Sequence, residues 1–393
     1  MDDLASRSPL PPHVELLAVG GGVAAARCVR AMRRQGFRGS ILLVGDESLP
    51  PYNRPPLSKE LLLTDDPPPD ELLLAEAEEW YARRGVLLAR GATVARLDLD
   101  ARTATLTDGT RVGYDRCLIA TGAAPRPLRI AGGERALLLR TVTDARILRG
   151  AIDAHRGAAA VVVGGGFIGL EVASALAARG LSATVVELGD TLWGGQLGRL
   201  LAARAGDLLA AAGVTVRLGA AVTRLDAGGA WIGDELLPTS LVVAGIGVVP
   251  RDELARAAGL AVDDGILVDE AGRTSDSAIW AAGDVTRVGG QRVEHWHAAR
   301  EAGERAAASM LGQAVADVPV PWVFSELAGT TLDVMGAPAS GDEEAWLADE
   351  RVVVSSREGR TVGLAVLGGA IAPQAARSLI GQPHAAVVAA LER

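Results

Sequence analysis

The fold is decided by residues 159–187, which read AAVVVGGGFIGLEVASALAARGLSATVVE. The apolar run 159–163 predicts a buried strand, the three glycines predict a tight turn, and residues 170–179 predict a helix. A second strand follows at 183–186, and the acidic Glu187 stands at its end. This combination of strand, Gly-x-Gly-x-x-Gly turn, helix and later acid is typical of a dinucleotide-binding βαβ unit.

The same pattern occurs 144 residues earlier, around Gly20-x-Gly22-x-x-Ala25. In such a turn the first glycine permits the sharp bend, and the second lets the backbone approach a pyrophosphate. The helix that follows offers free N–H groups and positive potential to phosphate. Asp46 ends the next strand, where a carboxylate accepts hydrogen bonds from ribose hydroxyls. The chain therefore carries a duplicated nucleotide-binding unit.

Two nucleotide units predict two nucleotides. FAD with NADH is the economical pair, because a hydride donor needs an acceptor. The second turn consists of Gly164, Gly165, Gly166, Phe167, Ile168 and Gly169, and with Glu187 it is a complete second copy of the pattern. Glu187 would repel a 2′-phosphate, and no arginine occurs at 188–190, which favours NADH over NADPH.

Composition and charge exclude several classes of function. The length of 393 residues predicts two or three domains. A net charge of −9 argues against a nucleic-acid partner, and no apolar run is long enough for a membrane helix. Residues 1–12 lack a secretory pattern and predict a disordered leader, so we expect a cytoplasmic protein.

The two cysteines, Cys28 and Cys117, stand 89 positions apart. They form neither a disulfide framework nor a CxxC motif nor a metal cluster. We expect both to be small buried hydrophobic residues, which argues against a thiol-dependent mechanism.

The segment 51–62 is exceptional in this arginine-rich chain. It contains Lys59, the only lysine among 39 basic residues, and Asn53, the only asparagine. A lone lysine marks a place where the compact ammonium matters, although chance explains it as well.

The string Pro51-Tyr-Asn-Arg-Pro-Pro-Leu-Ser-Lys59 resembles that of NADH-dependent ferredoxin reductases, which serve Rieske oxygenases and bacterial cytochromes P450. Rubredoxin reductases and apoptosis-inducing factor are more distant relatives. The resemblance covers about residues 14–312. Further matching strings are Gly164-Gly-Gly-Phe-Ile-Gly-Leu-Glu171, Ala244-Gly-Ile-Gly247-Val-Val-Pro250, Arg273-Thr-Ser-Asp276, Ala282-Gly-Asp284 and Glu294-His-Trp296.

The resemblance implies specific site residues. The implied FAD contacts are Gly20, Gly22, Ala24, Asp46, Arg54, Lys59, Val94, Ala120, Arg140, Asp284 and Trp296. The predicted FAD site also includes Ala25, from the glycine-turn pattern, and His295, as a candidate near the isoalloxazine. The implied NAD site consists of the second glycine turn, Glu187 and Gly247. Lys59 is expected to pair with Glu171 beside the flavin N5, where an ammonium favours reduced, anionic flavin. These two residues are the predicted catalytic pair.

We therefore predict an α/β fold of the glutathione-reductase type, with two Rossmann-like domains and an α+β C-terminal domain. The predicted FAD domain is discontinuous, comprising residues 13–117 and 248–320. The NAD domain comprises 118–247, and the C-terminal domain 321–393. NADH would stack on the flavin and pass hydride to N5, so the hydride step needs orientation and electrostatics rather than an acid–base catalyst.

Several residues have a second interpretation. Phe167 shields the flavin in the family, but a phenylalanine there could equally pack helix on sheet. Asp284 could bind the ribityl chain or cap the segment that follows. His295 could lie near the flavin or in an exposed loop, and with His297 it lacks the further ligands of a metal site.

The C-terminal region departs from the family pattern. Family members carry Phe-Trp-Ser-Asp-Gln where this chain has Val323-Phe324-Ser325-Glu326-Leu327, preceded by Trp322. The missing tryptophan puts electron delivery to a standard ferredoxin in doubt. An acidic reductase also needs a local basic patch for an acidic ferredoxin. The candidates are Arg27, Arg30 and Arg34 on one helix and Arg300 and Arg305 on another, although a solvated helix face explains both sets.

Three functions are compatible with these features. The first is an NADH:ferredoxin oxidoreductase that delivers single electrons to a [2Fe–2S] ferredoxin. The second is a stand-alone FAD/NADH oxidoreductase acting on oxygen, a quinone or another small molecule. The third is a redox-sensing interaction protein, and either a monomer or a homodimer fits.

Overall fold

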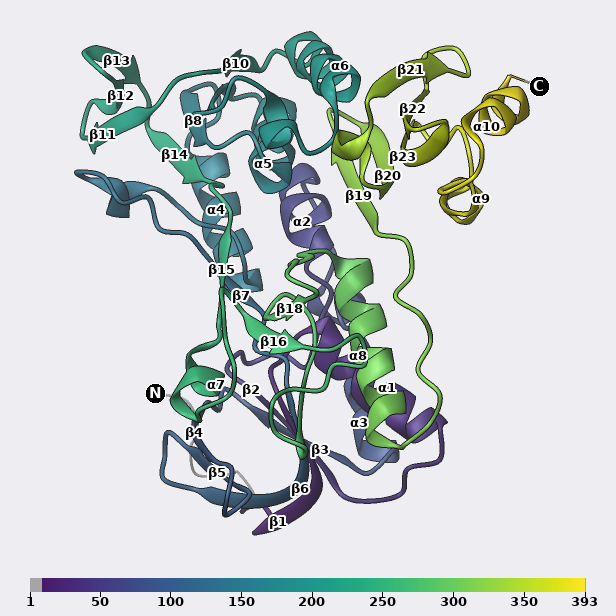
Figure 1. Cartoon of the computed structure of the whole chain (residues 1–393). Helices are drawn as coiled ribbons and strands as arrows, with labels where there is room; N and C mark the ends of the chain where they lie inside the picture. Colours follow the sequence, from purple (N-terminus) through teal and green to yellow (C-terminus); the bar gives the residue numbers. More distant parts are fainter. Residues whose placement is uncertain (1–8, 393) are drawn as a thin grey trace. The chain divides into compact units, whose positions relative to one another are not determined.

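The computed structural model describes residues 9–392, so the first eight residues of the predicted leader lie outside it. The chain forms two compact units (Figure 1). Unit 1 comprises residues 9–53, 69–124 and 249–318 of this range, and unit 2 comprises 54–68, 125–248 and 319–392. The boundaries at 124/125 and 248/249 fall within the short strands β7 (Ala123–Pro125) and β15 (Val248–Pro250).

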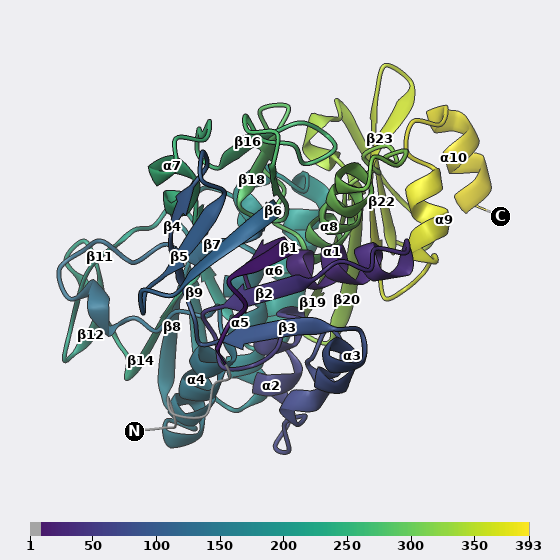
Figure 2. The same ribbon diagram turned by 90° about the horizontal axis from the view of Figure 1, so that it is seen from below.

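Unit 1 is built on one seven-stranded sheet, and Figure 2 labels six of its strands, β1 to β6. Its strand order is β3-β2-β1-β6-β5-β4, and β17 also pairs with β6. The parallel part consists of β1 (His13–Val19), β2 (Ile41–Gly45), β3 (Val86–Arg90), β6 (Arg111–Ile119) and β17 (Ile279–Ala281). The strands β4 (Val94–Asp98) and β5 (Thr103–Leu106) extend it in antiparallel fashion.

Two helices of unit 1 pack closely, α1 (Val23–Arg34) and α8 (Trp296–Met310). A glycine makes this contact possible: a Cβ on Gly303 would lie 2.2 Å from the carbonyl oxygen of Ala24. Because α1 begins at the first glycine turn, α8 braces the helix that would hold a phosphate. The remaining elements are η2 (Asp70–Leu72), α3 (Glu78–Arg83), α7 (Glu253–Ala257), β16 (Ile266–Val268) and β18 (Thr286–Val288).

Unit 2 contains a second parallel sheet, of order β10-β9-β8-β14. Its strands are β8 (Ala159–Val163), β9 (Ser182–Val186), β10 (Thr215–Arg217) and β14 (Leu241–Ala244). The helices are α2 (Glu60–Leu63), α4 (Val142–Ala154), α5 (Phe167–Ala178) and α6 (Arg199–Ala211), with the short turns η1 (Pro55–Ser58), η3 (Gly133–Arg135) and η4 (Leu192–Gly195). An antiparallel sheet of β11 (Val222–Asp226), β12 (Gly229–Ile232) and β13 (Glu235–Pro238) accompanies them.

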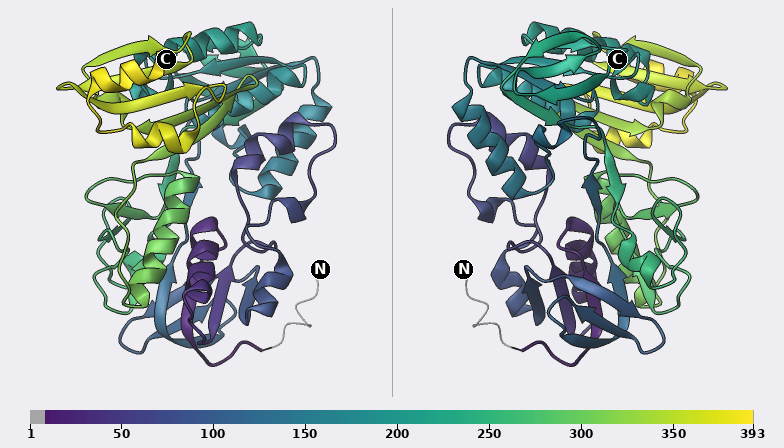
Figure 3. Two further views of the ribbon diagram at one scale, coloured as in Figure 1. Left: turned by 90° about the vertical axis from the view of Figure 1, so that its right-hand side faces the viewer. Right: turned by 90° about the vertical axis from the view of Figure 1, so that its left-hand side faces the viewer.

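The C-terminal part of unit 2 is a five-stranded antiparallel sheet of order β19-β20-β23-β22-β21. Figure 3 shows two yellow helices against its yellow-green strands. The elements are β19 (Trp322–Leu327), β20 (Thr330–Gly336), η5 (Pro338–Ser340), β21 (Glu343–Leu347), β22 (Val352–Arg357), β23 (Arg360–Leu367), α9 (Pro373–Ser378) and α10 (His384–Leu391).

The predicted α/β class with two parallel nucleotide-type sheets is confirmed. The C-terminal part of the described chain ends in two helices, α9 and α10, because Gly381 and Pro383 interrupt the helical run. Residues 54–68 belong with unit 2 although they follow the first nucleotide unit in the chain. The three-domain division itself stays a prediction.

Candidate functional site

The first glycine turn, in unit 1, has the backbone geometry of a phosphate cradle. Gly20 has a φ of +129°, and a Cβ there would lie 2.1 Å from the carbonyl oxygen of Ala120, so only glycine fits. A Cβ on Gly22 would meet nothing within 4 Å. Gly22 is also the N-cap of α1, and no side chain caps that helix. Open space before an uncapped helix N-terminus fits a pyrophosphate group.

Asp46 follows β2 beside this turn, as predicted for the ribose-binding acid. Its carboxylate accepts a hydrogen bond from Nη1 of Arg251 at 2.8 Å. The hydroxyl of Thr121 in turn donates to the carbonyl oxygen of Arg251 at 2.7 Å. Sequence reasoning missed Arg251, because 205 residues separate it from Asp46.

The other unit 1 residues predicted for FAD fall into two groups. The side chains of Ala24, Ala25, Val94 and Ala120 are buried in hydrophobic cores, so only their backbone atoms are suited to contact a nucleotide. Asp284 stands in a turn just before the strand β18 (Thr286–Val288), and both of its interpretations stay predictions.

Trp296 and His295 lie at the start of α8. The indole Nε1 of Trp296 donates to Oδ1 of Asn53 at 2.9 Å, and Nδ2 of Asn53 donates to the carbonyl oxygen of Leu73 at 3.2 Å. Burial lowers the pKa of His295 to about 4, although nearby Asp284 opposes the shift. His295 is therefore a neutral imidazole at neutral pH, and its side chain is half-buried. Its place near the flavin stays a prediction.

The second glycine turn, in unit 2, repeats the first. A Cβ on Gly164 would lie 2.4 Å from the carbonyl oxygen of Gly245, and one on Gly169 would lie 2.0 Å from that of Gly164. Gly166 is the N-cap of α5, and again no side chain caps the helix. This turn therefore has the same capacity for phosphate.

Glu187 stands at the end of β9 and closes this turn. Its carboxylate accepts hydrogen bonds from the backbone N–H of Gly165 at 2.6 Å and of Gly189 at 2.7 Å. Within the described residues no cation forms an ion pair with it. The Glu187 carboxylate is thus held at the turn by backbone N–H groups and not by a cationic side chain.

Phe167, the first residue of α5, is half-buried. Its ring lies 5.8 Å from that of Trp193, at an interplanar angle of 42°. Ile168 is exposed beside it. Both interpretations of Phe167, as flavin shield or as packing residue, stay predictions.

Lys59 and Glu171 form a buried ion pair within unit 2. Lys59 Nζ lies 2.7 Å from Glu171 Oε1, and the residues are 8% and 4% exposed. The hydroxyl of Ser325 donates to the same oxygen at 2.6 Å, and the hydroxyl of Ser58 donates to Oε2. Both carboxylate oxygens are therefore satisfied, as a buried charge requires. The ring centroid of Phe324 lies 5.7 Å from Lys59 Nζ, within cation–π range.

Ser58 and Ser325 were absent from the predicted site. The sequence offered no signal for them beyond their places next to Lys59 and in the altered C-terminal string. The strand β19 brings Ser325 to a helix 154 residues earlier in the chain.

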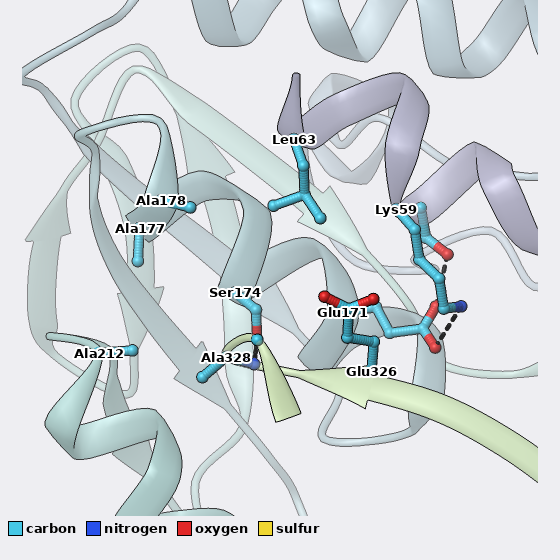
Figure 4. Close-up of a pocket in the computed structure, with 11 residues that line it drawn as sticks. Lys59, Leu63, Glu171, Ser174, Ala177, Ala178, Ala212, Glu326 and Ala328 are labelled. Carbon is cyan, nitrogen blue, oxygen red and sulfur yellow. Dashed lines mark hydrogen bonds and ion pairs between the residues drawn. The ribbon is translucent and has the colours of Figure 1, made fainter. Parts of the chain in front are cut away.

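A cavity of about 220 Å³ adjoins this ion pair (Figure 4). Lys59 enters it from the segment before α2, Glu171 from α5 and Glu326 from the end of β19. Its other lining residues are Ser58, Leu63, Ser174, Ala177, Ala178, Ala212, Ala328 and Gly329.

Two further predicted FAD residues meet in unit 2. Arg54 Nη1 donates to the carbonyl oxygen of Arg140 at 2.6 Å, and the backbone N–H of Arg140 donates to Asp144 at 3.1 Å. Gly247, predicted for NAD, has a φ of +89° beside the side chain of Arg126.

Both cysteines are buried and free, as predicted, and burial raises the pKa of both thiols. Raised values suppress the reactive thiolate. No cluster of His, Cys, Asp or Glu within residues 9–392 is suited to hold a metal ion. None of the described helices is long and apolar enough to cross a membrane.

The predicted basic patches are largely paired with acids. Arg27 and Arg30 of α1 both contact Glu76, and Arg300 of α8 contacts Glu304 at 3.7 Å. Arg305 Nε donates to a backbone carbonyl, that of Glu270. Such pairs reduce the net positive charge of this surface, and Arg34 remains exposed at the end of α1.

His295 predicts an acid-sensitive stability. In the unfolded chain it binds a proton near pH 6.5, whereas the folded protein resists protonation down to about pH 4. The neutral His295 therefore contributes to the free energy of unfolding above pH 6.5, and this contribution is lost as the pH falls toward 4. We expect the melting temperature of His295→Gln to fall less between pH 7 and pH 4 than that of the wild type, as measured by thermal unfolding. Parallel curves for the two proteins would show that His295 is not held neutral.

Comparisons with known proteins agree with this geometry. The family model for pyridine nucleotide-disulphide oxidoreductases matches residues 14–303. The biphenyl dioxygenase system ferredoxin–NAD(+) reductase component of Paraburkholderia xenovorans (strain LB400) is 38% identical over 330 residues, which cover 81% of this chain and 80% of that protein.

Two solved structures are also similar. The covalent putidaredoxin reductase–putidaredoxin complex matches with a TM-score of 0.87 at 29% identity, covering 94% of this chain and 93% of that one. The ferredoxin reductase for the CYP199A2 system of Rhodopseudomonas palustris matches with a TM-score of 0.85 at 30% identity, covering 91% of each chain. The chain therefore belongs to the pyridine nucleotide-disulphide oxidoreductase family and is an FAD-containing NAD(P)H oxidoreductase.

Proposed function

We propose that this protein is an NADH:ferredoxin oxidoreductase that passes electrons from NADH through FAD to a [2Fe–2S] ferredoxin. The observation that carries the proposal is the buried Lys59–Glu171 pair, set on the helix that begins at the second glycine turn. Relatives named as ferredoxin reductase components over four-fifths of the chain support the choice of acceptor. A cytoplasmic location and a monomer or homodimer belong to the same proposal.

FAD, when bound, accepts a hydride at N5 and releases electrons singly. The chain would hold its pyrophosphate at the N-terminus of α1 and its ribose at Asp46. Lys59 supplies a positive charge that favours the reduced, anionic state. Glu171 keeps that ammonium in place and compensates its charge in the buried surroundings.

We infer that NADH is the preferred donor. Glu187 is fixed at the turn by two backbone N–H groups, so it cannot withdraw without losing both hydrogen bonds. A 2′-phosphate at this point would face an uncompensated carboxylate, whereas a 2′-hydroxyl could donate to it.

The altered C-terminal string, residues 323–327, supports a second candidate function. Phe324 stands where family members carry tryptophan, and its ring faces Lys59. A smaller aromatic side chain at this place leaves more room, which suits a stand-alone reductase of oxygen, a quinone or another small molecule. The third possibility, a redox-sensing interaction protein, would instead keep its reduced flavin for long times.

An anaerobic absorbance titration separates these functions. The FAD-loaded protein is bleached with NADH and then mixed with air or with an excess of purified [2Fe–2S] ferredoxin. We expect ferredoxin to restore the oxidised spectrum faster than air does. Rapid recovery in air without any effect of ferredoxin would favour the stand-alone enzyme, and slow recovery with both would favour the redox sensor.

Glu187→Gln should weaken the selection against NADPH, because the amide keeps hydrogen-bonding capacity but loses the charge. The ratio of kcat/KM for NADH to that for NADPH should fall by about tenfold. Glu134→Gln, an exposed acid of the same unit, is the matched control and should leave the ratio unchanged. A wild-type enzyme that prefers NADPH would contradict the role given to Glu187.

A further inference from the structure

The segment 191–198, here called the tryptophan loop, lies between Glu187 and α6. Four of its residues, Trp193, Gly194, Gly195 and Gly198, have positive φ values between +55° and +87°. Three of them are glycines, which adopt positive φ without steric strain. Trp193 has a Cβ, so the same conformation is strained for it. A loop so rich in glycine is ordered only where neighbouring groups hold it.

One end of the tryptophan loop rests on the second glycine turn. The backbone N–H of Trp193 donates to the carbonyl oxygen of Gly165 at 2.9 Å, and its ring contacts that of Phe167. The indole itself is 6% exposed, and its Nε1 finds no hydrogen-bond partner among the described residues. The loop thus contacts two residues of the second glycine turn, Gly165 and Phe167.

The other end of the loop is held from the C-terminal sheet. Gly198 is the N-cap of α6 and has no side chain with which to cap it. Glu344 of β21 supplies the cap instead. Its carboxylate accepts from the backbone N–H of Arg199 at 3.1 and 3.0 Å and from that of Leu200 at 3.0 Å.

Glycine suits position 198 for two reasons, its φ of +87° and the closeness of the capping carboxylate. A Cβ there would lie 2.3 Å from Oε1 of Glu344. Gly198 and Glu344 are therefore matched, although 146 positions separate them. A carboxylate at a helix N-terminus is stabilised both by hydrogen bonds and by the helix dipole.

We propose that Glu344 is a positioning residue for the pyridine nucleotide site. By fixing the start of α6, it holds the tryptophan loop against Gly165 and Phe167 in the arrangement that accepts the nucleotide. The proposal rests on the function proposed above, because it assumes a pyridine nucleotide at the second turn. It also makes β21, at the edge of the C-terminal sheet, sensitive to nucleotide binding, since coupling between two sites is reciprocal.

The first test measures NAD⁺ affinity by calorimetry on FAD-loaded protein. Glu344→Ala should weaken binding about three- to tenfold, and Glu344→Gln, which keeps an acceptor oxygen, should lose less. In turnover the KM for NADH should rise while kcat stays within about twofold. The control is Glu343→Ala, because Glu343 is the exposed neighbour on the same strand and makes none of these contacts.

The second test uses hydrogen exchange, first on the wild type and then on Glu344→Ala. Saturating NAD⁺ should slow exchange in residues 191–203 and also in 343–347 of the wild type, and Glu344→Ala should abolish only the second effect. Unchanged NAD⁺ affinity in Glu344→Ala, or no protection of 343–347 in the wild type, would overturn the proposal while leaving the proposed function intact. A wild type that binds no NAD⁺ would overturn the proposed function itself.

Discussion

A buried ion pair between Lys59 and Glu171 holds together the segments of unit 2 that surround the candidate site. Removing one partner of such a pair leaves an uncompensated charge and costs about 3–5 kcal/mol, so each residue constrains the other. The pair joins the segment before α2 to α5, and Ser325 joins β19 to the same carboxylate of α5. Three parts of the chain, far apart in sequence, are thereby held around one carboxylate.

This constraint explains a feature of the chain's organisation. Residues 54–68 directly follow the first nucleotide-binding unit, yet they pack with unit 2. Lys59 needs Glu171, and Arg149 of α4 donates to the backbone carbonyls of Leu61, Thr64 and Asp65. The segment thus finds both its charge partner and its backbone partners in unit 2.

The sequence predicted the fold and the family because both are encoded locally. Each glycine turn, its helix and its terminal acid lie within 30 residues, and their spacing alone indicates the βαβ unit. The resemblance around Lys59 predicted its pairing with Glu171, and the distance of 2.7 Å agrees. The roles of the remaining site residues stay predictions, because no nucleotide is present to test them.

The site residues that the sequence did not predict are placed by contacts between segments that lie far apart in the chain. Arg251 reaches Asp46, Ser325 reaches Glu171, and Glu344 caps α6, each across more than 140 residues. Neither periodicity nor local spacing carries information on such pairs. The neutral state of His295 was equally hidden, since it follows from burial and not from any motif.

The most direct test of the ion pair's role is the rate of flavin reduction by NADH in anaerobic stopped-flow experiments. The account predicts that Lys59→Met retains FAD but is reduced at least about tenfold more slowly, because the charge that favours reduced flavin is gone. Glu171→Gln should retain FAD and be affected less, since the ammonium remains. Reduction of Lys59→Met at the wild-type rate, with full FAD content, would contradict the claim that this lysine serves the chemistry.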